Sequence, residues 1–271
     1  MPWRHIQTSR LRRIFFESFS AMDIAQPLTS FDTEADADTT KAFMLETGLD
    51  IVGLRVQGHM AGYVYAQELA GGKCGDYLRN FTPDDVVSNT ANFVEVVKSL
   101  AINDLCFVTI LDQVGAIITK IDLEKPPMRM FLFGVITLGE MMMTEIIRQR
   151  FSDGSWQNHL SPQRLEKAKV LQEERLRRGQ KVDLIDCLQY GDKGWILSFQ
   201  EDFRLALGLE SRNAARKALN ELESLRNNLA HTQEIIPTSW QRIVISCSRL
   251  ERNLEIIAQN LHNPGQNGAM P

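Results

Sequence analysis

An internal duplication is the feature that most restricts how this chain can fold. Between residues 39 and 123 the same succession of segments occurs twice: a helical stretch, a strand, a turn and a second strand. Gly62 and Gly115 stand at matching places in the two copies, 53 residues apart. One copy of such a unit cannot bury its own apolar face. We therefore expect the two copies to pack face to face.

The second copy contains the stronger strand signals. β-branched and aromatic residues dominate 106–111 and 117–119, as is typical of strands. The preceding segment, 26–39, is acidic and rich in turn residues, and we expect a connection there. The expected elements are a helix at 40–47 with strands at 50–56 and 61–65, then a helix at 91–101 with strands at 105–111 and 114–119.

The second copy ends in a short motif, Gly115-Ala-Ile-Ile-Thr119-Lys-Ile-Asp122. With the tandem arrangement, this ending resembles a pair of CBS domains, a family that senses adenosyl ligands. The resemblance implies a regulatory adenine nucleotide, with Thr119 on a phosphate and Asp122 on the ribose hydroxyls. A hydroxyl delivered where a helix begins suits an anion, and a carboxylate can accept two hydrogen bonds from a diol. The alternative is that Asp122 only caps a helix.

The first copy departs from that motif. It reads Gly62-Tyr-Val-Tyr-Ala66-Gln-Glu-Leu69, so that Ala66 stands in place of the threonine and Leu69 in place of the aspartate. We therefore expect at most one competent nucleotide site per pair.

The part of the chain after the duplication is expected to be helical throughout. Lys125-Pro126-Pro127 stops one segment, and a helical run follows over 128–151. Ser161-Pro162 and Ser211 have the residue types that begin helices. Short helical stretches at 184–188 and 196–207 are expected on either side of Gly191-Asp-Lys-Gly194. The helix after Ser211 carries an apolar stripe and predicts a bundle: Ala215, Ala218, Leu219, Leu222 and Leu225.

These expectations give an α+β protein with the following organisation. An N-terminal amphipathic helix at 1–22 precedes a CBS-like α/β pair at 23–127. Connecting helices at 128–182, an all-α bundle at 183–262 and a tail at 263–271 complete the chain.

The residues that carry chemistry cluster at the end of the apolar stripe. Arg226, Asn227 and His231 fall within two helical turns. Asn227 and His231 share a face, whereas Arg226 and His231 are about 140° apart and border a groove. Glu223, three residues before Arg226, is placed to hold its guanidinium.

This block resembles the Arg-x4–6-His motif of HEPN domains, which are small helical bundles that include metal-independent ribonucleases. The resemblance gives Arg226 the place of the motif arginine, Asn227 the polar position and His231 that of the motif histidine. It implies a homodimer, or a higher even oligomer, in which two motifs line one RNA cleft. No metal is required for such catalysis. The alternatives are that the C-terminal dipole of the helix favours His231 and that Arg226 only pairs with Glu223.

Composition excludes several other classes of protein. Thirty Lys and Arg against 34 Asp and Glu give a net charge of −4, which excludes a globally basic nucleic-acid-coating protein. The four cysteines lie far apart with no C-x-x-C, which argues against a zinc site and fits a reducing compartment. No segment has the roughly 18 uncharged apolar residues of a membrane helix. We expect a cytoplasmic protein without a membrane partner.

Three functions remain open on the sequence. The first is a ligand-regulated, metal-independent endoribonuclease, in which the CBS-like pair senses an adenosyl nucleotide and Arg226 and His231 cleave RNA. The second is a non-catalytic nucleotide-sensing regulator whose helical bundle binds a partner protein. The third is a purely structural dimer whose site has decayed.

Overall fold

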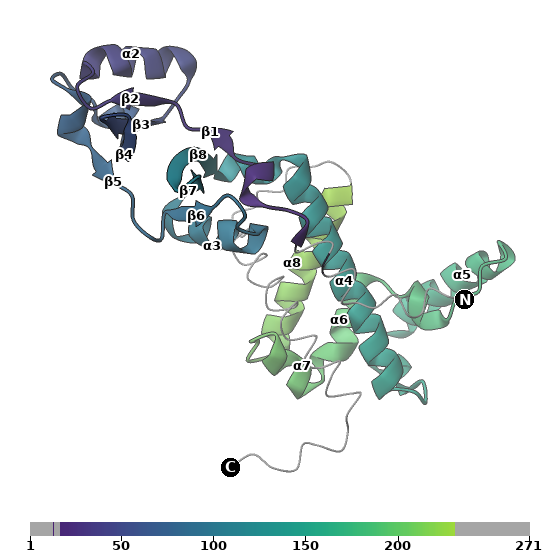
Figure 1. Ribbon diagram of the computed structural model, residues 1–271. Helices are drawn as coiled ribbons and strands as arrows, with labels where there is room; N and C mark the ends of the chain where they lie inside the picture. Colours follow the sequence, from purple (N-terminus) through teal and green to yellow (C-terminus); the bar gives the residue numbers. More distant parts are fainter. Residues whose placement is uncertain (1–12, 14–16, 231–271) are drawn as a thin grey trace, which may run out of the picture. The chain divides into compact units, whose positions relative to one another are not determined.

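The computed structural model describes residue 13 and residues 17–230 (Figure 1). Within that part, the chain divides into two compact units, one of residues 17–128 and the other of residue 13 together with residues 129–230. The first unit contains both sheets and the second is helical, which confirms the α+β class. The predicted N-terminal helix at 1–22 lies mostly outside the described residues, and the tail at 263–271 lies outside them entirely.

The N-terminal unit contains two four-stranded sheets with the orders β2-β3-β4-β5 and β1-β8-β7-β6. In both, a parallel pair is followed by an antiparallel hairpin. The elements are η2 (Ala21–Asp23), β1 (Gln26–Pro27), β2 (Ser30–Asp32), α2 (Ala37–Thr47), β3 (Ile51–Val56), β4 (His59–Tyr65), η3 (Ala66–Glu68), η4 (Cys74–Tyr77), β5 (Arg79–Asn80), β6 (Val86–Ser88), α3 (Phe93–Asn103), β7 (Leu105–Ile110), β8 (Gln113–Thr119) and η5 (Lys120–Glu124).

The two sheets share an aromatic core, as the duplication predicts. The ring of Tyr63 on β4 lies 4.7 Å from that of Phe107 on β7, and Phe81 stacks against Tyr63 at 5.7 Å. Leu28 and Leu105 are buried in the same cluster. Because residues of both hairpins fill one apolar layer, each copy supplies the surface that the other needs to exclude water.

The sequence pattern did not predict the short outer strands. The segment 26–39, expected to be a connection, contains β1 and β2. β1 pairs with β8 of the second sheet, and β2 pairs with β3 of the first. Strands of two or three residues carry too few side chains to show an alternating pattern, so their partners determine them.

The helical unit begins within the longest helix, α4. Ser161 accepts from the Arg164 backbone N–H at 3.4 Å, and Ser211 accepts from that of Ala214 at 3.1 Å, so both predicted caps are confirmed. The elements are α4 (Pro126–Arg150), η6 (Ser155–His159), α5 (Pro162–Arg177), η7 (Leu184–Cys187), α6 (Tyr190–Ser198), α7 (Glu201–Ala206) and α8 (Arg212–Ala230).

One expected break is wrong. Gly191 and Gly194, expected to separate two helices, both lie inside α6. Their lack of a side chain serves helix packing, because a β-carbon on Gly194 would lie 2.7 Å from Cδ1 of Leu219 on α8. The glycines therefore allow α6 and α8 to approach closely.

Among the described residues, α4 is the one helix whose length and composition would suffice to cross a membrane. Most of its apolar window is buried inside the protein, as in the core helix of a helical bundle. Its exposed apolar side chains are Met130, Phe133 and Met141. The cytoplasmic location expected from the sequence stays a prediction.

Candidate functional site

Helix α8 positions the motif residues that the structure describes. Ala215, Leu219, Leu222 and Leu225 of the predicted stripe are buried, whereas Ala218 is only half-buried. Arg226 follows this stripe and is half-buried, whereas Asn227 is exposed. The Arg226 Nη1 lies 3.4 Å from the Asn227 Oδ1, so the guanidinium and the amide meet at the border of the packed face. His231 lies outside the described residues.

Glu223 has a different neighbour from the one expected. Its carboxylate lies against α6, where a β-carbon on Gly191 would come 2.6 Å from Oε2. Between Glu223 and Arg226, both within the described part, the structure has no ion pair. Arg226 therefore contacts its neighbour Asn227 instead of Glu223, and Glu223 contributes to the contact between α6 and α8.

Asp122 is buried at the end of β8 and has a full set of partners. Its Oδ2 accepts from the Thr119 backbone N–H at 2.7 Å and from the Thr119 hydroxyl at 2.9 Å. Its Oδ1 accepts from Gln26 Nε2 at 2.6 Å and pairs with Lys125 Nζ at 2.9 Å. Thr119 and Asp122 thus form the capping box of η5. The structure brings the two predicted ligand residues together, and Thr119 donates its hydrogen bonds to Asp122.

The electrostatics of Asp122 follow from these contacts. Burial by itself raises the pKa of the carboxyl group, but hydrogen bonds from Lys125, Thr119 and Gln26 outweigh it and lower the pKa below its usual value. The carboxylate is 1% exposed. A ribose could reach it only by replacing Gln26 or Lys125.

The equivalent residues of the first copy are not those expected from the sequence. Leu54 pairs with Gly62 and Val108 pairs with Ala116, so the two hairpins correspond at an offset of 54, not 53. Tyr65 therefore corresponds to Thr119, and each is the N-cap of the following 3-10 turn.

By the same offset, Glu68, and not Leu69, corresponds to Asp122. Arg79 Nε donates to Glu68 Oε2 at 2.9 Å, and the Arg79 guanidinium lies 5.1 Å from the centre of the Tyr65 ring. The bulges between Leu54 and Arg55 and between Val108 and Thr109 lie at equivalent places, but Gly115 corresponds to Ala61 and not to Gly62, so aligning the glycines shifts the comparison by one residue.

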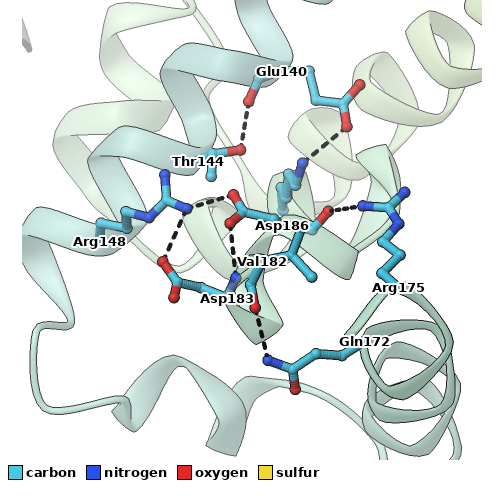
Figure 2. Close-up of polar contacts among 9 residues, drawn as sticks. Glu140, Thr144, Arg148, Gln172, Arg175, Val182, Asp183 and Asp186 are labelled. Carbon is cyan, nitrogen blue, oxygen red and sulfur yellow. Dashed lines mark hydrogen bonds and ion pairs between the residues drawn. The ribbon is translucent and has the colours of Figure 1, made fainter. Parts of the chain in front are cut away.

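A polar network in the helical unit was not anticipated (Figure 2). Arg148 on α4 pairs with Asp186 on η7 and lies 3.5 Å from Asp183. On the same helix, Glu140 accepts from the buried Lys193 of α6 at 2.9 Å. Gln172 and Arg175 of α5 donate to backbone carbonyls of Val182 and Asp186 at 3.2 Å each. These contacts attach η7 to α4 and α5, and α6 to α4. The paired residues lie far apart in sequence, so no periodic pattern predicts them.

The C-terminal helices have a family match that includes the motif. Residues 138–255 match the family model for Swt1-like HEPN. The match confirms the HEPN-like C-terminal region expected from the sequence. The Swt1-like HEPN region begins inside α4, within the stretch that the sequence analysis assigned to connecting helices, and it contains Arg226, Asn227 and His231.

Solved CBS-domain structures are similar to part of this chain. A hemolysin-like protein from Oenococcus oeni PSU is 13% identical, with 43% of this chain and 94% of that chain covered and a TM-score of 0.35. The CBS domain of a bacterial CNNM/CorC family Mg²⁺ transporter, in complex with ATP, is 15% identical, with 43% and 92% covered and a TM-score of 0.35. CbpB in complex with c-di-AMP is 12% identical, with 43% and 89% covered and a TM-score of 0.35.

No curated protein matches the chain in sequence. Among the described residues, no group of three or more His, Cys, Asp or Glu side chains could hold a metal ion. Cys74, Cys106 and Cys187 are buried free thiols, and burial raises the pKa of Cys106 to about 11.

Proposed function

We propose that the Swt1-like HEPN region cleaves RNA without a metal ion, with Arg226, Asn227 and His231 as the reacting set. The observation that carries the proposal is that the family match contains all three residues, and that α8 presents Arg226 and Asn227 together. A guanidinium at this position presents its donors in a rigid plane that matches the oxygens of a phosphate.

The chemistry assigns one task to each side chain. The 2′-oxygen of the ribose attacks phosphorus, and the bond from phosphorus to the 5′-oxygen breaks. One proton leaves the 2′-hydroxyl and one is delivered to the 5′-oxygen, and His231 transfers one of these because imidazole titrates near neutral pH. Arg226 offsets the charge that develops on the phosphorane oxygens, and Asn227 orients the imidazole or a phosphate oxygen. The products are a 2′,3′-cyclic phosphate and a 5′-hydroxyl.

The proposal includes a homodimer in which two copies of the motif line one cleft. A two-fold axis would place an Arg226 and a His231 from each protomer around one scissile phosphate. Analytical ultracentrifugation tests the assembly. A monomer that cleaves RNA at full rate would contradict this part of the proposal alone.

The proposal assigns an adenosyl ligand to the end of β8, at Thr119 and Asp122. The ligand must displace Gln26 or Lys125 from the Asp122 carboxylate, because both oxygens already have partners. Thermal unfolding with ATP, AMP and cyclic di-AMP tests this, because a bound ligand raises Tm in wild type and Asp122→Asn loses the shift. If none of the three nucleotides raises Tm, the proposed nucleotide site at Thr119 and Asp122 is contradicted.

Cleavage of labelled RNA in the presence of EDTA tests the enzymatic part. The proposal predicts cleavage by wild type and its loss in Arg226→Ala and in His231→Ala. Equal cleavage by all three proteins would assign the activity to a contaminant and would remove the catalytic proposal.

A further inference from the structure

A second arginine reaches the segment that carries the proposed RNA site. Arg129, near the start of α4, lies with its Nη2 3.4 Å from the backbone carbonyl oxygen of Asn228 on α8. Asn228 follows Arg226 and Asn227 directly, and two residues separate it from His231. The contact joins two helices 99 residues apart in sequence, at the turn of α8 that matters for the proposed chemistry.

We propose that Arg129 is a positioning residue for this site, an inference that rests on the proposed function. Its guanidinium holds the α8 backbone at Asn228, and so fixes the direction in which Arg226 and Asn227 leave the helix. A guanidinium is suited to this task because its donors lie in a rigid plane and it keeps its charge at any physiological pH.

The place of Arg129 in the chain adds a further point. It lies nine residues before the start of the Swt1-like HEPN match, so the match does not assign it a role.

Steady-state cleavage of RNA by the full chain tests the role of Arg129. For Arg129→Ala we expect kcat to fall roughly 10- to 100-fold with KM within about threefold, because a misplacement near 1 Å costs about this much. Arg129→Lys retains a charged donor and should recover most of the rate. Arg164→Ala is the matched control, because the Arg164 guanidinium pairs at 2.6 Å with the buried Asp192 on α6 of the same unit, a partner outside α8.

The outcomes separate the alternatives. An unchanged kcat in Arg129→Ala, or an equal loss in Arg164→Ala, would overturn the positioning role. A raised KM with normal kcat would overturn it in favour of direct phosphate binding by Arg129. If wild type does not cleave RNA, the proposed function fails, but hydrogen exchange of the backbone amides at 226–230 still tests the contact between Arg129 and Asn228. Arg129→Ala must speed exchange there. Unchanged exchange would show that Arg129 does not hold this part of α8.

Discussion

Gln26 donates from Nε2 to Oδ1 of Asp122 at 2.6 Å, across 96 residues of sequence. The same relationship occurs in the other sheet, where Arg79 Nε donates to Glu68 at 2.9 Å. Gln26 pairs with Ile117 and Arg79 pairs with Tyr63, which are equivalent positions of the two hairpins. Each copy therefore fastens an edge strand to the acidic residue that follows its central hairpin.

Acid should weaken the N-terminal unit through Asp122. Its lowered pKa means that folding favours the carboxylate, so this stabilisation is complete above the unfolded-state pKa of about 3.9 and is lost as pH falls through the lower folded-state value. Asp122→Asn should lower the free energy of unfolding at pH 7 by about 1–3 kcal/mol, and the difference from wild type should shrink below about pH 4.

Urea unfolding between pH 7 and pH 2 measures this dependence. Asp112→Asn is the matched control, because Asp112 is exposed at a hairpin tip and asparagine tolerates its positive φ of 63°. A constant difference between Asp122→Asn and wild type at every pH would contradict the assignment.

The two glycines of α6 should respond differently to alanine. In Gly194→Ala the new β-carbon would lie 2.7 Å from Leu219 Cδ1, inside packed core, and we expect a loss of about 1–3 kcal/mol in the free energy of unfolding. In Gly191→Ala the close atom is the carboxylate end of the half-buried Glu223, which can rotate away. Chemical denaturation measures the free energy of unfolding of both variants. Equal losses would show that the backbone freedom of glycine, and not side-chain packing, determines the loss of stability.

Removing one partner of the ion pair between the buried Lys193 and the partly buried Glu140 should cost more stability than replacing both. Lys193→Ala leaves a partly buried carboxylate without its partner, and we expect a loss of about 1–3 kcal/mol in the free energy of unfolding. Replacing both residues, Lys193→Met with Glu140→Leu, removes both charges and should cost far less. A double variant less stable than Lys193→Ala would contradict this account of the pair.

Much of the fold could be predicted because its signals are local. β7 and β8 are rich in β-branched residues, Ser161 and Ser211 are short-range caps, and the apolar stripe of α8 repeats at helical spacing. β1 and β5 could not be predicted, because two residues show no pattern and their partners lie far along the chain.

The candidate site shows the same division between local and distant information. The motif of Arg226, Asn227 and His231 lies within six consecutive residues, so the sequence alone was enough to single it out. The partners of Asp122 could be predicted only in part, because Lys125 lies three residues away whereas Gln26 comes from a remote strand. Arg129 and Asn228 meet through the packing of two helices, for which no periodicity gives a signal.

The central claim is that Arg226 and His231 cleave RNA through its own 2′-hydroxyl. The most direct measurement is the chemistry of the new RNA ends made in EDTA by wild type, Arg226→Ala and the exposed α8 control Arg216→Ala. The account predicts 2′,3′-cyclic phosphate and 5′-hydroxyl ends from wild type and Arg216→Ala, and intact RNA with Arg226→Ala. Ends that carry a 5′-phosphate, or undiminished cleavage by Arg226→Ala, would contradict it.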